Sequence, residues 1–91
     1  MLIELTKGQY ARIDHDDWQQ IFSFKWQAQP TRLKNGFYAV RNNGTDDFGK
    51  RLKVKMHRQI MNCPDGLEVD HINGNTLDNR KCNLRICTHA Q

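Results

Sequence analysis

The sequence predicts a small α+β domain, in which an N-terminal antiparallel β-sheet with a short helix precedes a compact C-terminal core. The chain has 91 residues, of which 37% are hydrophobic, and this is enough for one domain with a modest core. In residues 1–55, apolar and polar side chains alternate over several short runs, which is the period of half-buried strands. Glycine, proline and asparagine separate these runs, as expected of turns between antiparallel strands.

The first two strands are expected at Leu2–Leu5 and Tyr10–Ile13, on either side of a glycine-containing turn, and they predict a β-hairpin. The period changes in residues 14–22, where we expect a short helix with Asp14 as its N-cap. Its acidic first turn suits the helix dipole and needs no catalytic role. The apolar face expected of this helix consists of Trp18, Ile21 and Phe22.

Two further strands are expected in the middle of the chain. An alternating run at Phe24–Gln29 predicts a half-buried strand. The tripeptide Lys34–Gly36 is a strong turn signal and leads into a strand at Phe37–Arg41. A polar, glycine-bearing loop is expected at residues 42–49. The side of the first strand that should be buried carries Phe24, Trp26 and Ala28.

Residues 51–56 alternate strictly between basic and apolar side chains. The basic side chains are Arg51, Lys53 and Lys55, and the apolar ones, which are expected to pack inward, are Leu52, Val54 and Met56. Successive residues on one face of a strand lie ~7 Å apart, close to the phosphate spacing of a nucleic-acid strand. The basic ridge therefore predicts phosphate contacts that position DNA without reading its sequence. The alternative is an edge strand that its lysines protect against aggregation.

The distribution of charge supports a nucleic-acid partner. The net charge is +4, and residues 31–60 hold eight basic and two acidic side chains, while the flanking thirds are each slightly acidic. Such a basic block is typical of a protein that binds DNA. No apolar run approaches the ~18–20 residues that span a bilayer, and the N-terminus lacks a signal-peptide pattern, so we expect no membrane partner. Three widely spaced cysteines predict no disulfide framework and favour the cytoplasm.

The segment after the basic strand predicts a short helix at residues 57–62, with Met56 and Ile60 on one face, stopped near Pro64. His57 opens this helix and has two interpretations. It is either a buried, hydrogen-bonded histidine of the core or a side chain that lines a functional site, and we favour the core.

The stretch from Val69 to Arg85 contains the candidate chemistry. Asp70 and His71 are adjacent, an Asn-Gly turn follows, and Asn83 opens a second apolar run twelve residues after His71. On a strand at Val69–Ile72, the acid and the imidazole would point to opposite faces. They could then act on opposite sides of one scissile group, one holding a metal ion and the other activating water.

This stretch resembles the core of the HNH endonucleases, in the branch of phage-borne and intron-borne homing and nicking enzymes. The matching segments are Val69–Gly74, Leu77–Arg80, Asn83–Arg85 and, upstream, Met56–Met61. The resemblance implies a ββα-metal fold, with strands at Val69–Ile72 and Leu84–Cys87 and a helical turn that Asp78 would cap. It divides the chain into a β-rich DNA-contacting region at residues 1–55 and a nuclease core at residues 56–91.

The resemblance also implies roles for individual side chains. His71 would be the general base, Asn83 would fix the orientation of its ring, and Asp70 would bind Mg²⁺ or Mn²⁺. DNA contacts are expected from Arg51, Lys53, Lys55, Arg58, Arg80 and Arg85. The expected activity is metal-dependent hydrolysis of DNA, with nicking of one strand preferred, in the cytoplasm of a bacterial or phage-infected host cell. The alternative is a non-catalytic DNA-binding module or an inactive nuclease fragment.

One departure from the family concerns the metal. A second ligand, usually Asn, follows the second strand in the family and would fall just past Gln91, so the last helix is expected to be cut short. Truncation is the favoured explanation, and the alternatives are a natural remnant of a nuclease or His89 as a substitute ligand. A structural zinc site at Cys63, Cys82, Cys87 and His89 is disfavoured because no Cys-x-x-Cys pair is present. The sequence does not distinguish a monomer from a dimer.

Overall fold

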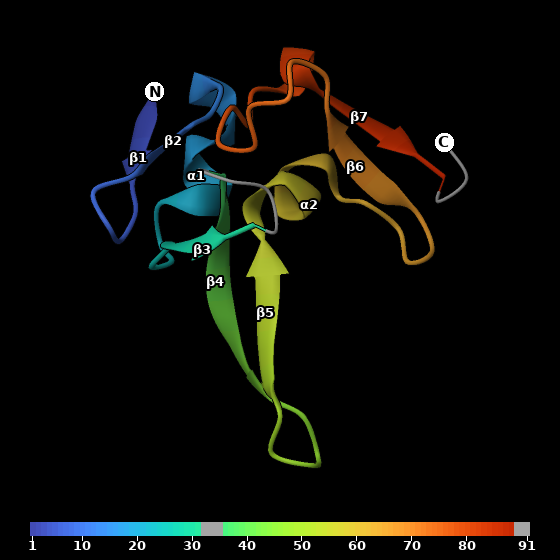
Figure 1. Ribbon diagram of the computed structural model, residues 1–91. Coiled ribbons are helices and arrows are strands. Elements are labelled where there is room, and N and C mark those ends of the chain that lie inside the picture. Colours follow the sequence, from blue (N-terminus) through green and yellow to red (C-terminus); the bar gives the residue numbers. More distant parts are fainter. Residues whose placement is uncertain (32–35, 89–91) are drawn as a thin grey trace.

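The computed structural model describes residues 1–31 and 36–88 and has the expected α+β fold. Three small antiparallel sheets, with strand orders β1-β2, β3-β4-β5 and β6-β7, are joined by short helical segments (Figure 1). No helix in the described residues is long and apolar enough to span a membrane. In chain order the elements are β1 (Leu2–Glu4), β2 (Tyr10–Arg12), η1 (His15–Asp17), α1 (Trp18–Ile21), β3 (Gln27–Pro30), β4 (Phe37–Thr45), β5 (Arg51–Lys55), α2 (Met56–Met61), β6 (Glu68–His71), η2 (Lys81–Asn83) and β7 (Leu84–Cys87).

Strands β1 and β2 form the expected N-terminal hairpin. Ile3 lies opposite Ala11, and both side chains are buried between exposed neighbours. Leu5 and Ile13, which follow the two strands, are buried as well. The period-two alternation of the sequence therefore gives the correct inward face here.

The expected helix over residues 14–22 forms in two short pieces, η1 and α1, and two details of the prediction are wrong. Asp14 occupies the N-cap position, but its carboxylate caps nothing in the helix and instead accepts the backbone N–H of Lys81 at 2.9 Å. Trp18 and Phe22 stack on each other with ring centroids 5.2 Å apart and remain exposed, so Ile21 alone is buried. The α-helical piece has only four residues, which is too short to carry a long apolar face.

Strand β3 begins at Gln27, later than the alternating pattern predicts. Trp26 is buried as expected, and its indole N–H donates to the carbonyl of Ile21 at 2.9 Å. Phe24 is partly exposed and lies outside the strand, because the chain is still leaving helix α1 at that point. Most of the turn expected at Lys34–Gly36 lies outside the described residues.

Strand β4 continues through the first half of the loop expected at residues 42–49 and ends at Thr45. The true turn is shorter, and the Asp46 carboxylate organises it by accepting the backbone N–H groups of Phe48 and Lys50 at 2.9 and 2.8 Å. Polar residues and Gly44 suggested a loop, but pairing with β5 supplies backbone hydrogen bonds that local sequence does not reveal.

The inward packing expected of the β5 apolar residues is wrong for Leu52. This side chain is exposed, Val54 is half-buried, and only Met56, which begins helix α2, is fully buried. Figure 1 shows the cause, because the β4–β5 hairpin extends away from the other elements. Both faces of its outer half therefore meet solvent.

Helix α2 confirms the expected helix, shifted by one residue toward the N-terminus. Met56 and Ile60 are buried on one face, as expected, and the helix ends at Met61, followed by the C-cap Asn62, which adopts a left-handed conformation with φ of 48°. Strand β7 has the predicted bounds, and β6 begins one residue earlier than predicted. The second half of the chain is therefore the better predicted half.

One buried cluster joins the two regions that the sequence suggested. It includes Ile3 and Ile13 from the N-terminal hairpin together with Met56 and Leu84 from the C-terminal region. The backbone of Arg12 also bonds across to residues 77–79, donating to Leu77 at 2.7 Å and accepting from Asn79 at 2.8 Å. The segment before η2 thus rests on the N-terminal hairpin. The functional division at residue 55 stays a prediction.

Candidate functional site

Strands β6 and β7 place the adjacent acid and imidazole on opposite faces of a two-stranded sheet. Asp70 pairs with Arg85, and His71 pairs with Leu84. The His71 residue is buried, with 8% of its surface exposed, whereas the side chain of Asp70 is 46% exposed. Period-two alternation predicted this separation, because neighbouring side chains on a strand point in opposite directions.

The His71 ring is held by contacts that leave it one basic position. Its Nε2 lies 2.7 Å from Oδ1 of Asn79, which is itself fully buried. An amide oxygen only accepts, so Nε2 carries the proton and Nδ1 keeps its lone pair. Burial lowers the pKa of His71, against the opposing effects of the Asn79 hydrogen bond and the Asp70 and Asp78 charges. The imidazole is therefore neutral near pH 7.

His57 lies directly against this ring and is buried, as we expected of a core residue, but the hydrogen bond that we also expected is not found for its buried Nδ1 among the described residues. The two imidazoles meet edge to face with centroids 4.7 Å apart, and the Tyr38 ring lies 5.4 Å from His57 and 6.3 Å from His71. Burial, reinforced by His71 and nearby cations, lowers the pKa of His57 to about 3. The side chain thus belongs both to the core and to the surroundings of His71.

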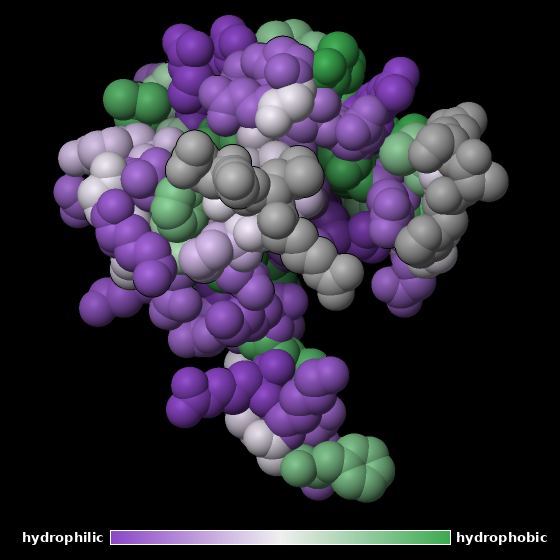
Figure 2. Space-filling model, viewed as in Figure 1, coloured by the Kyte–Doolittle hydropathy of each residue, from purple (hydrophilic) through white to green (hydrophobic). Residues whose placement is uncertain are grey.

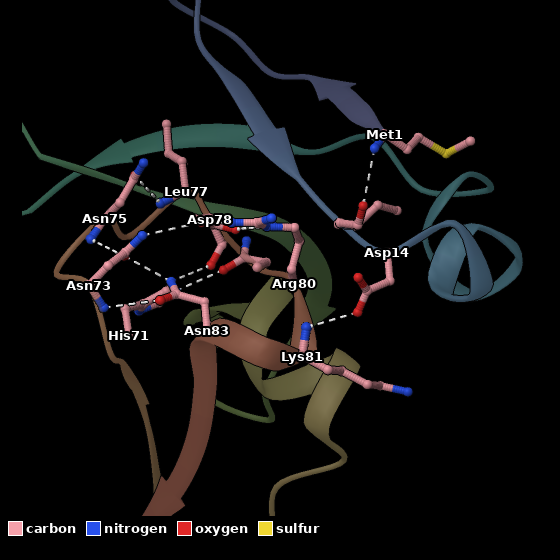
Figure 3. Close-up of polar contacts among 12 residues, drawn as sticks. Met1, Asp14, His71, Asn73, Asn75, Leu77, Asp78, Arg80, Lys81 and Asn83 are labelled. Carbon is pink, nitrogen blue, oxygen red and sulfur yellow. Dashed lines mark hydrogen bonds and ion pairs between the residues drawn. The ribbon is translucent and has the colours of Figure 1, made fainter.

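The structure corrects the contact expected of Asn83. Its amide does not bond to the His71 ring; Oδ1 accepts the backbone N–H of Asn73 at 3.0 Å. Its Nδ2 donates to Oδ1 of Asn73 and to the carbonyl of Asp78, both at 2.9 Å (Figure 3). Asn83 therefore fastens the loop between the two strands. Asn79 contacts the ring instead, and no spacing signal in the sequence identified it.

Asp78 is not the N-cap that the sequence predicted. The 3₁₀ turn η2 begins at Lys81, and Asp78 is buried before it. Both Asp78 oxygens bind the Arg80 guanidinium at 2.8 Å, and Oδ2 also accepts from Asn73 at 3.2 Å (Figure 3). Hydrogen bonding to Arg80 lowers the pKa of Asp78 to about 2 despite its burial. Its charge is thus used within the loop.

The basic residues expected to contact DNA fall into two groups. Arg58 donates to the carbonyls of Leu67 and Pro64 at 2.8 and 3.4 Å, and Arg80 is bound to Asp78. Arg85 pairs with Asp70 at 2.9 Å. These three guanidinium groups already serve intramolecular contacts, whereas Arg51, Lys53 and Lys55 on β5 have exposed side chains and no ion pair among the described residues.

Asp70 is the candidate metal ligand that the sequence predicted, and the structure places it on an accessible face of β6. Asp70 is partly exposed, and Mg²⁺ commonly binds one or two carboxylates together with waters and substrate phosphates, so this carboxylate fits part of such a site. No group of three or more His, Cys, Asp or Glu side chains is arranged for a metal within residues 1–31 and 36–88. The cysteines, Cys63, Cys82 and Cys87, are all free. His89, the suggested substitute ligand, lies outside the described residues.

Comparison with known proteins gives consistent results. A sequence model of the HNH endonucleases matches residues 62–91. An uncharacterized HNH endonuclease of Acanthamoeba polyphaga mimivirus is 31% identical over 96 aligned positions, which cover 99% of this chain and 45% of the viral protein. The chain therefore spans less than half the length of that relative. No solved structure matches.

Proposed function

Because this chain belongs to the HNH endonuclease family, we propose that it is a DNA endonuclease in which His71 is the general base. The observation that carries the proposal is the state of the His71 ring. The ring is neutral because burial lowers its pKa, and Asn79 binds Nε2, so Nδ1 remains able to accept a proton. A neutral imidazole with one free lone pair is the form that a general base requires.

In the proposed step, Nδ1 of His71 takes a proton from the water that attacks the phosphodiester. Asn79 keeps the proton on Nε2 and fixes the ring plane, and the edge-to-face contact with His57 limits rotation. Asn83 contributes indirectly, because its amide holds Asn73 beside the end of β6. These residues thus position the base before substrate arrives.

Asp70 is proposed to hold a divalent ion, Mg²⁺ or Mn²⁺, from the opposite face of β6. When bound, such an ion stabilises negative charge on the scissile phosphate and on the leaving oxygen. Without it, Arg85 neutralises Asp70 through two hydrogen bonds to Oδ2, at 2.9 and 3.2 Å. Both side chains are well exposed, so the pair is weak and Arg85 can exchange Asp70 for a DNA phosphate.

The exposed cations of β5 are proposed to bind DNA phosphates beside the site. Lys55 is the nearest, because its Nζ lies 4.9 Å from the Tyr38 ring, which in turn contacts His71. Cleavage of one strand, as in the homing and nicking branch, is our preferred form of the activity. Protection of an exposed edge strand remains the competing explanation for Lys53 and Lys55.

The test is cleavage of supercoiled plasmid by the full chain in Mg²⁺ or Mn²⁺, with chelator as the blank. His71→Ala should abolish cleavage and keep DNA affinity within a few-fold, while His15→Ala, at an exposed histidine, should leave both unchanged. Nitrogen-15 NMR should show the His71 proton on Nε2. Cleavage by His71→Ala at the normal rate, or a proton on Nδ1, would contradict the proposed base.

A non-catalytic DNA-binding module is the second candidate. It is favoured by a single observation, namely that no group of three or more His, Cys, Asp or Glu side chains among the described residues is arranged to hold a metal ion. DNA binding without cleavage in either metal, by a chain whose His71 tautomer is as proposed, would favour this module.

A further inference from the structure

The β4–β5 hairpin forms an arm that projects from the rest of the molecule (Figure 1), and its two faces carry different side chains. We propose that one face of this arm enters the major groove and reads base edges through Asn42 and Thr45, flanked by Arg51 and Lys53. This inference rests on the proposed function in that it takes duplex DNA as the substrate. It goes further by assigning sequence preference to four side chains.

The strand register brings these side chains together. Asn42 lies opposite Lys53, and Thr45 lies opposite Arg51. Directly opposed residues of an antiparallel pair project from the same face. Thr45 follows Asn42 by three residues on β4, whereas Arg51 precedes Lys53 by only two residues on β5. The irregularity between Asn42 and Thr45 accommodates the extra residue of β4. Without that irregularity, Thr45 would point to the opposite face from Asn42.

The side chains on the Asn42 face of the arm are polar or basic, and such groups interact favourably with a DNA groove. The side chains of Asn42, Thr45, Arg51 and Lys53 are all exposed, and none has a side-chain hydrogen bond or ion pair among the described residues. No carboxylate lies among these paired positions, since the Asp46 carboxylate is engaged in the turn beyond them. Most of the projecting part of the molecule is hydrophilic in Figure 2, with a hydrophobic side chain at its tip, where Phe48 is 95% exposed in the turn.

At the base of the arm, the opposite face is engaged with the body of the protein. Arg41 donates to Gln59 at 2.9 Å, contacts Asn43 at 3.4 Å, and lies over the Phe24 ring at 4.0 Å. Its partner across the ladder is the half-buried Val54. On the Asn42 face, by contrast, the described polar side chains are exposed and make no side-chain hydrogen bond or ion pair within the described part of the protein.

The same side of β4 leads to the candidate active site, past Val40, which is buried. Tyr38, Val40 and Asn42 alternate along β4 and so share one face, and Val40 lies opposite Lys55. The Lys55 ammonium group is 4.9 Å from the Tyr38 ring, and Tyr38 contacts His71. One duplex lying on this face would thus meet the base at one end and the arm at the other.

The spacing sets where the preference should appear. Lys53 and Arg51 lie ~7 and ~13 Å beyond Lys55 along an extended strand. With a rise of ~3.4 Å per base pair, these distances correspond to about two and four base pairs. The distance from Lys55 through Tyr38 to His71 is added to this span along the strand. The arm should therefore read base pairs within about eight base pairs of the cut, on one side of it.

Base reading is favoured over phosphate contact alone for two reasons. A two-stranded β-ribbon fits the width of the major groove. The amide of Asn42 carries a donor and an acceptor side by side, which match the N7 and N6 positions of adenine, whereas a phosphate would use only the donor. Arg51 and Lys53 can bind guanine or the flanking phosphates, and so secure the ribbon in the groove.

The experiment is selection of bound sequences from duplexes with randomised base pairs, using the full chain in chelator so that no cleavage occurs. The full chain should enrich a preference over a few contiguous positions. Asn42→Ala should reduce discrimination at one of them about 5- to 150-fold and keep affinity for random duplex within about twofold. Asn43→Ala, the matched change on the opposite face, should keep the preference.

Four results would overturn the inference: no DNA binding, binding without sequence preference, an unchanged preference in Asn42→Ala, or an equal loss in Asn43→Ala. Cleavage in Mg²⁺ is measured separately, so the two proposals fail independently. Selective binding without cleavage would reject the proposed activity alone. Cleavage without any binding preference would reject the reading arm alone.

Discussion

Replacing Asn83 by Ala should destabilise the fold strongly, because this amide fastens the loop between β6 and β7. The change removes three hydrogen bonds, to the backbone N–H and side chain of Asn73 and to the carbonyl of Asp78, from a residue that is only 6% exposed. At about 1 kcal/mol for each bond, the free energy of unfolding should fall by ~3 kcal/mol. For a domain of this size, the melting temperature should fall by roughly 12–24 °C.

Thermal and urea unfolding followed by circular dichroism would measure this effect. Asn43→Ala is the matched control, because its amide makes one exposed contact of 3.4 Å and the change should cost less than ~0.5 kcal/mol. Cleavage by Asn83→Ala should recover in part below its melting temperature, since the residue does not touch the His71 ring. A variant as stable as Asn43→Ala but without cleavage would refute the loop-fastening role and indicate a direct catalytic one.

Three further outcomes are expected. Asp78→Asn should destabilise the protein at neutral pH, because a carboxyl group whose pKa is lowered to about 2 contributes stability only while it is ionised. The difference in unfolding free energy between the variant and the unmutated chain should therefore shrink as the pH falls from about 4 to 2, and urea titrations across this range would measure it. Arg85→Gln should leave stability within ~1 kcal/mol and tighten Mg²⁺ binding a few-fold, measured by calorimetry, since it frees Asp70 from an exposed pair. Replacing Lys53 and Lys55 by Gln should lower the slope of log affinity against log salt by ~1–2, and an unchanged slope would favour edge protection.

Short-range patterns in the sequence predicted the site's scaffold well. The opposite orientation of Asp70 and His71, the bounds of β7 and the buried face of α2 all follow from side-chain periodicity within one element. Such features depend on neighbours a few residues apart, so local sequence is sufficient to predict them.

The contacts of the site were not predicted, because they join segments that no periodicity relates. Asn79 reaches His71 through a loop that rests on the backbone of Arg12, more than sixty residues earlier. Asp78 had the residue type of an N-cap, but a neighbouring guanidinium competed successfully for its carboxylate. Residue type therefore indicated which side chains were polar and important locally, and only the tertiary arrangement assigned their partners.

A count of charges along the chain likewise concealed how those charges are used. Three of the six cations expected on DNA are bound within the protein, two of them to the carboxylates Asp78 and Asp70. The other three of these six cations all lie on β5. Two of them, Lys53 and Arg51, are paired across the strands with the uncharged polar residues Asn42 and Thr45 of β4. Since free cations determine the electrostatic part of DNA affinity, binding should depend mainly on this one strand. The loop arginines should instead affect stability and the geometry of the His71 site.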